Sequence, residues 1–203
     1  MARRRDERID HAVLDAVSAL VREVGYPALT MEAIAARAGT TKPAIRRRWQ
    51  SRQQLVVAAM ARDRVGLTEI DTGCLHCDIT GHLEALRAGM EDAALGPVIP
   101  ALLADLAGDP GLHEEFLDVL WEPRRQACVA TLRKAQERGE LEQTADVDLV
   151  LDLFAAPIVF RALFRHAAMG PDFAELVTCA VLAGVGGAAG RECARAASAS
   201  GRR

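Results

Sequence analysis

The segment TMEAIAARAGTTKPAIRRRWQSR, at residues 30–52, constrains the fold most, because two short helical patterns meet there at a glycine. Thr30 is a typical N-cap for the first pattern, whose apolar residues recur at helical spacing, and Gly39 supplies the backbone freedom that ends it. Thr40 or Thr41 then caps the second pattern, with Pro43 in the first turn, where a missing N–H is tolerated. The segment therefore predicts a helix-turn-helix.

The second helix of this motif is cationic, since it carries Lys42 and the run of arginines at 46–48. A charge run is usually a solvated face, but in this position it predicts contact with phosphates. Ile45 and Trp49 are four residues apart and so share one face of the helix. We interpret Trp49 as a core anchor and not as a ring that stacks on a base.

Composition favours an all-helical chain, because half of the 203 residues are apolar and no segment alternates strictly between apolar and polar residues. We predict an all-α fold of about nine helices. It would comprise a three-helix helix-turn-helix domain at residues 1–52, a connector helix at 53–65 and a larger helical domain at 66–203. Residues 1–64 hold 13 Lys and Arg against 7 Asp and Glu, whereas the remainder holds 12 against 21. This asymmetry favours a polyanion as the partner of the N-terminal domain.

No apolar run approaches the ~20 residues of a membrane span, so we expect a cytoplasmic protein with no membrane partner. The five cysteines form an odd set in a core-bearing chain, which predicts free thiols. No motif indicates a cofactor. In the C-terminal domain we expect a loop at 66–80, a helix that starts at Asp78 or Thr80 and runs to about residue 92, and another that has Pro97 and Pro100 at its head and ends near Gly108. Three further helices are expected at 112–138 with a kink at Pro123, at 146–166 and at 172–190.

The last two of these helices predict a homodimer. The first is apolar on almost every side, and the second combines an apolar face with small residues that allow close approach. One core is too small to cover both, so we expect them to pair with their copies as a four-helix bundle. The residues assigned to this interface are Leu153, Phe160, Leu163, Phe164, Phe173, Leu176, Val177, Ala180, Val181 and Gly184.

The pattern T-M-E-A-I-A-A-R-A-G-T-T-K-P-A-I-x-R-R-W-x-S-R, behind one helix and ahead of a helical C-terminal domain, resembles the TetR family of transcriptional regulators. The motif covers residues 6–60, and the rest of the chain agrees in helix order and length. The resemblance implies a homodimeric repressor whose heads enter the major groove of a palindromic double-stranded DNA operator. It also implies that an unidentified small-molecule effector, bound in the C-terminal domain, releases the DNA.

By position, the resemblance implies phosphate contacts at the cap Thr30 and base-edge contacts by Thr41, Lys42 and Ala44, roles that suit their chemistry. Two residues depart from the family pattern: Arg46 stands where a tyrosine is usual, and Gln50 where a proline is usual. The full set of expected DNA contacts is Thr30, Thr40, Thr41, Lys42, Ala44, Arg46, Arg47, Arg48 and Arg52.

The C-terminal domain holds two further candidate sites. Cys74, His76 and Cys77, with His82 beyond, could assemble a zinc or redox site, and a metal- or redox-responsive regulator is therefore one alternative. A single C-x-x-C in an interdomain loop is a weak signal, however, and we favour incidental thiols. An effector pocket is assigned to Met90, Phe116, Trp121, Arg124, Phe160, Arg161 and Phe164, although their spacing also fits core packing. No catalytic motif is present, so we expect no enzyme activity, with a small-molecule-binding or enzymatic bundle as the other alternative.

Overall fold

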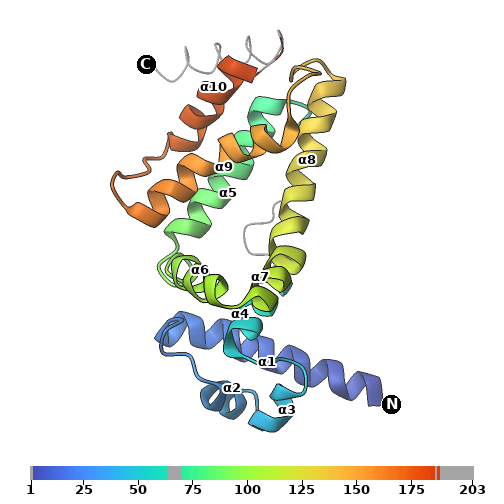
Figure 1. The fold of residues 1–203 in the computed structure, drawn as a ribbon, viewed down its shortest axis with the longest axis vertical. Coiled ribbons are helices and arrows are strands. Elements are labelled where there is room, and N and C mark those ends of the chain that lie inside the picture. The colour runs from blue at the N-terminus through green and yellow to red at the C-terminus, as the bar shows by residue number, and fades with distance from the viewer. Residues whose placement is uncertain (1, 64–69, 186, 188–203) are drawn as a thin grey trace. The chain divides into compact units, whose positions relative to one another are not determined.

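A computed structural model describes residues 2–63, 70–185 and 187 (Figure 1). Its elements are α1 (Ala2–Val24), α2 (Met31–Arg37), α3 (Lys42–Arg46), α4 (Arg52–Arg62), α5 (Leu75–Glu91), α6 (Val98–Gly108), α7 (Pro110–Phe116), the π-helical segment η1 (Leu117–Trp121), α8 (Glu122–Glu137), α9 (Val147–Phe164) and α10 (Phe173–Val185). The described residues contain no strand, which confirms the all-α prediction. Within those same ranges, no helix has the length and apolar character needed to cross a membrane.

The chain forms two compact units that interleave in sequence. Unit 1 is drawn from Met1–Val65 and Asp92–Pro123, and unit 2 from Gly66–Glu91 and Arg124–Arg203. The sequence had placed a single boundary at residue 66. Leu102 and Leu106 of α6 instead join Leu55 of α4 in one hydrophobic core. The helices α6 and α7 and the segment η1 therefore belong to the same compact unit as the helix-turn-helix.

Unit 2 is built around α5, α9 and α10, which pack against one another. Leu75, Ile79, Phe154, Ile158 and Leu182 are almost fully buried in its core. The helix α9 was expected to be covered on two sides because it is apolar all round. Within unit 2 only part of its surface is buried, and several large apolar side chains stay exposed.

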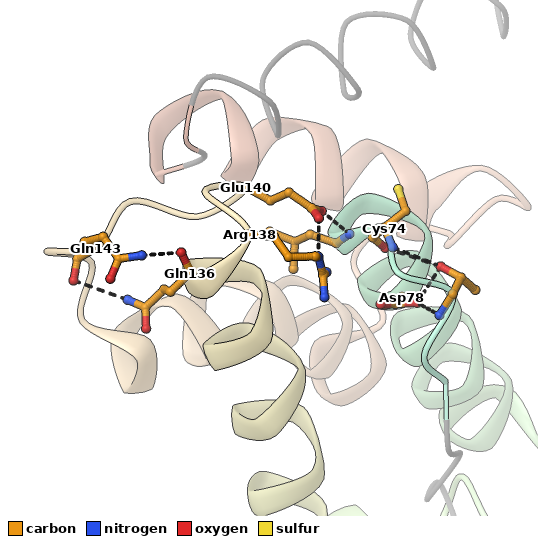
Figure 2. A network of polar contacts seen from close by, with 8 residues as sticks. Cys74, Asp78, Gln136, Arg138, Glu140 and Gln143 are labelled. Atoms are coloured by element: carbon orange, nitrogen blue, oxygen red, sulfur yellow. Dashed lines mark hydrogen bonds and ion pairs between the residues drawn. The ribbon is translucent and has the colours of Figure 1, made fainter.

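The helix α5 begins at Leu75, which corrects the expected loop at 66–80. Two carboxylates hold this end, one from the first turn of α5 itself and one from outside the helix. Asp78 accepts hydrogen bonds from the backbone N and the hydroxyl of Thr72, at 2.7 and 2.6 Å. The side chain of Glu140 reaches from the loop after α8 and accepts from the backbone N of Leu75 at 2.5 Å, as Figure 2 shows. The stretch that holds the paired cysteines is therefore helical.

Just before Pro123, where the sequence predicted a kink, the structure has the π-helical turn η1. Pro123 has no N–H to offer the carbonyl of Val119, so the regular i to i−4 ladder fails before the proline. The backbone N of Glu122 instead bonds the carbonyl of Leu117, five residues back. That bond defines the π-helical turn, a usual accommodation for such a break.

Candidate nucleic-acid interface

Two capped helices form the helix-turn-helix as the sequence predicted. The hydroxyl oxygen of Thr30 accepts from the backbone N of Ala33 at 3.1 Å, and that of Thr41 accepts from Ala44 at 3.3 Å. Gly39 lies between the two helices with φ +62°, a conformation that glycine adopts without strain. Each threonine O–H hydrogen remains a donor, because the cap bond uses only a lone pair. Both threonines are exposed, so these donors are accessible to a phosphate oxygen.

The core of unit 1 fixes α3 from one side. Ile45 is buried, and Trp49 packs against the same cluster while half-buried. The interpretation of Trp49 as an anchor is thereby confirmed. Since Ile45 turns inward, its neighbours Arg46 and Arg47 turn outward, and both are exposed. Neither arginine forms an ion pair with any side chain that the structure describes.

The cationic side chains on either side of Arg46 and Arg47 form ion pairs with carboxylates. Lys42 forms a close ion pair with Glu32 of α2, and that hydrogen bond, assisted by the charge of Arg46, keeps the pKa of Glu32 below its usual value. Arg48 is paired through its Nε with Asp10 of α1 at 2.7 Å. Asp10 and Glu32 were not singled out in the sequence, because neither is near its partner along the chain. The first pair ties α3 to α2, and the second ties the turn that follows α3 to α1.

Arg52 is used inside unit 1 itself. Its Nη1 donates to the carbonyl oxygens of Tyr26, Pro27 and Leu29 at 3.0, 3.0 and 3.1 Å, and its guanidinium lies 5.0 Å from the centre of the Tyr26 ring. The sequence had assigned Arg52 to the DNA backbone. In the structure it holds the α1–α2 loop against the start of α4.

The loop is tied to α6 as well. The Tyr26 hydroxyl donates to a carboxylate oxygen of Asp105 at 2.5 Å, and the amide of Gln53 donates to the same oxygen at 3.2 Å. Burial first, and then the hydrogen bond to Asp105, raises the pKa of Tyr26 well above its usual value. Among the remaining expected contacts, Thr40 and Ala44 are half-buried.

The residues assigned to an effector pocket are divided between the two units. Phe116 and Trp121 belong to unit 1, and Met90, Arg124, Phe160, Arg161 and Phe164 to unit 2. Phe160 and Arg161 line an open groove of about 610 Å³ together with Phe173. There the Arg161 guanidinium lies 4.0 Å from the centre of the Phe173 ring, and Nη1 donates to the Ala168 carbonyl at 2.6 Å.

The residues assigned to a dimer interface divide into outer and inner sets. Phe164 is 66% exposed, Leu176 64% and Phe160 53%, which is unusual for such large apolar side chains. Leu153, Ala180 and Gly184 are exposed too, and Leu163 and Val181 are half-buried. Phe173 and Val177 pack in the core of unit 2 and offer little surface to a partner.

The cysteine and histidine candidates do not converge. Cys77 is exposed, and a hydrogen bond with Cys74 is the main cause that raises the pKa of its thiol, followed by burial and nearby carboxylates. His82 is half-buried, and burial lowers its pKa. His76 is buried and meets Cys179 of α10, with its Nε2 3.4 Å from the Cys179 Sγ.

A capped helix-turn-helix with exposed arginines on its second helix defines a DNA-binding protein by its geometry. Two family profiles match the chain: "Bacterial regulatory proteins, tetR family" over residues 13–59 and "Tetracyclin repressor-like, C-terminal domain" over residues 69–181. The HTH-type transcriptional regulator YdeS of Bacillus subtilis is 32% identical over 164 residues, covering 79% of this chain and 81% of that protein. The chain belongs to the TetR family of transcriptional regulators.

Two further similarities agree with this assignment. The DNA-binding transcriptional repressor TetR of Mycobacteroides abscessus is 32% identical over 149 residues, covering 72% of this chain and 77% of that protein. The crystal structure of the TetR family transcription regulator SCO0332 superposes with a TM-score of 0.75 at 24% identity, covering 87% of this chain and 98% of that chain. The fold is therefore that of the family in both units.

Proposed function

We propose that the protein is a dimeric repressor that binds a palindromic operator in the major groove and is released by a small-molecule effector. One observation carries the DNA contact. Arg46 and Arg47 are exposed at the end of the capped second helix, while the cations on both sides are paired with carboxylates. These two guanidinium groups are the ones ready to meet phosphates.

Lys42 has a second role in this proposal. Its pair with Glu32 is at the surface, where solvent screens the attraction, so an approaching phosphate or base edge can replace the carboxylate. Glu32 then repels phosphates that arrive in another register, which adds selectivity. Such a regulator acts where chromosomal DNA is, and we accordingly place it in the cytosol and assign it no catalytic step.

The dimer is supported by the apolar surface of α9 and α10. Phe160 and Phe164 lie with their ring centroids 4.6 Å apart on α9, and Leu176 is exposed on α10. Large exposed apolar side chains that adjoin an open groove mark interaction surfaces. A second copy of the same face would bury them with twofold symmetry.

The effector site is proposed for the interior of unit 2, on the evidence of desolvated polar groups. Burial lowers the pKa of Arg124 and raises that of Cys128, one turn further along α8. On α5, the buried Nε2 of His82 has no hydrogen-bond partner among the described residues. A buried polar atom without a partner, such as this imidazole nitrogen, is typical of a ligand site.

The DNA contact is tested by fluorescence anisotropy on a fragment selected from genomic DNA, for the wild type, Arg47→Ala and Arg133→Ala. Arg133 is an exposed arginine of α8 in unit 2 and serves as a charge-matched control. A dimer loses two phosphate contacts in Arg47→Ala, so the slope of log affinity against log salt should fall by roughly 1.8. Arg133→Ala should keep the wild-type slope, and equal slopes for both variants would contradict the proposal.

A further inference from the structure

His76 and two side chains of α10 form a cluster in unit 2 that DNA binding does not use. Glu175 and Cys179 are four residues apart and so lie on one face of α10. His76 comes from the first turn of α5, a helix that packs against α10. One ligand atom from each of the three residues lies within 4.8 Å of the other two.

We propose that His76, Glu175 and Cys179 bind a divalent transition-metal ion of the Zn²⁺ class. The distances fit this chemistry. With Zn–N and Zn–S bonds of about 2.0 and 2.3 Å, the two ligand atoms on one tetrahedral ion lie about 3.5 Å apart. The His76 Nε2 and the Cys179 Sγ are 3.4 Å apart, so both can reach a shared ion without movement of either helix.

The ligand types also point to such an ion. Imidazole and thiolate together favour a borderline-soft ion over Mg²⁺ or Ca²⁺, which take oxygen ligands. The Glu175 carboxylate completes three protein ligands and leaves the fourth tetrahedral position to water. On binding, the Cys179 S–H bond breaks, the sulfur keeps the electron pair for the metal, and the proton passes to the solvent.

One ligand of the cluster is buried, and the other two are partly accessible to solvent. His76 is 7% exposed, whereas Glu175 and Cys179 are half-buried and open toward solvent. A neighbouring hydrogen bond, from the hydroxyl of Thr80 to that of Thr178 at 3.1 Å, keeps α5 and α10 in register. No other such group of three among the described residues brings its ligand atoms this close. Of the four cysteines and histidines that the sequence indicated as a possible metal site, only His76 belongs to this cluster.

The experiment titrates Co²⁺ into the full-length protein and records the thiolate-to-cobalt charge-transfer absorption, which Zn²⁺ should then abolish by displacement. Cys179→Ser should remove the absorption, and Glu175→Gln should weaken Co²⁺ binding by at least about tenfold. Cys77→Ser is the matched control, because its thiol is exposed and outside the cluster, and it should titrate as the wild type. Circular dichroism confirms that each variant is folded.

Three results would overturn the proposal. No absorption in the wild type would mean that His76 and Cys179 are a hydrogen-bonded pair only. Absorption that persists in Cys179→Ser, or that is lost in Cys77→Ser, would assign the metal to the other thiols. Unchanged affinity in Glu175→Gln, a variant that keeps the thiol and the imidazole, would remove the carboxylate from the ligand set. None of these results bears on the DNA contact of unit 1.

Discussion

Replacing Arg52 distinguishes a structural role from a DNA contact. The Nη1 atom has two hydrogens, so the carbonyls of Tyr26, Pro27 and Leu29 share about two full hydrogen bonds to it. Hydrogen bonds from a charged donor contribute ~1.5–3 kcal/mol each, and Arg52 is half-buried, so the lower value applies. Arg52→Ala should therefore lower the free energy of unfolding of unit 1 by about 3 kcal/mol.

Arg52→Lys sharpens the test, since it keeps the charge but loses the planar group. An ammonium bonds one or two of the carbonyls and stacks poorly on Tyr26, so we expect a loss of about half that of Arg52→Ala. If Arg52 only contacted a phosphate, Arg52→Lys would not lower the free energy of unfolding, and it would bind DNA nearly as well as the wild type. Arg47→Ala is the control, because Arg47 is exposed, and it should leave stability unchanged.

The assay is urea unfolding followed by tryptophan fluorescence. Both tryptophans, Trp49 and Trp121, lie in unit 1, so their emission reports on that unit, while circular dichroism reports on both. The affinity of each variant for operator DNA is measured in parallel by fluorescence anisotropy without urea. If Arg52→Ala is as stable as Arg47→Ala yet binds DNA as weakly, Arg52 is a DNA contact and the reasoning fails.

Three further changes follow from the same structure. Tyr26→Phe removes the donor to Asp105 and should cost about 1–2 kcal/mol in the same fluorescence assay; an unchanged midpoint would refute the role of that bond. Phe164→Asp should give monomers in analytical ultracentrifugation, whereas the same change at the exposed Leu103 of unit 1 should not. Burial lowers the pKa of His82, so below about pH 6.5 the unfolded state binds the proton more readily and stability falls. His82→Leu should lose less stability than the wild type between about pH 7.5 and 5.5, by circular dichroism in urea, and equal losses would contradict this.

The sequence predicted the helix-turn-helix well because its signals are local. The caps at Thr30 and Thr41 each bond a backbone N three residues ahead, and Gly39 ends α2 by its own conformation. The burial of Ile45 follows from helical spacing alone. In such a segment, residue type and register determine most of the contacts.

Contacts between distant parts of the chain were not predictable in this way. Glu140 accepts from the first backbone N–H of α5 from 65 residues away, so this part of the helix start is not encoded near Leu75. An arginine can bind either a phosphate or backbone carbonyls, so the residue type at position 52 does not reveal which partner it has. At Pro123 the local rule did predict an irregularity, but it did not predict that the turn before the proline would be π-helical.

The sharing of one core by the helix-turn-helix and by α6 and α7 bears on how members of this family can be recombined. A chimera that joins residues 1–65 of this chain to the C-terminal part of another regulator would remove Leu102 and Leu106 from the hydrophobic core that they share with Leu55. A chimera that also carries residues 92–123 keeps that core whole and preserves the bond between Tyr26 and Asp105. The transferable DNA-reading module is therefore discontinuous in sequence.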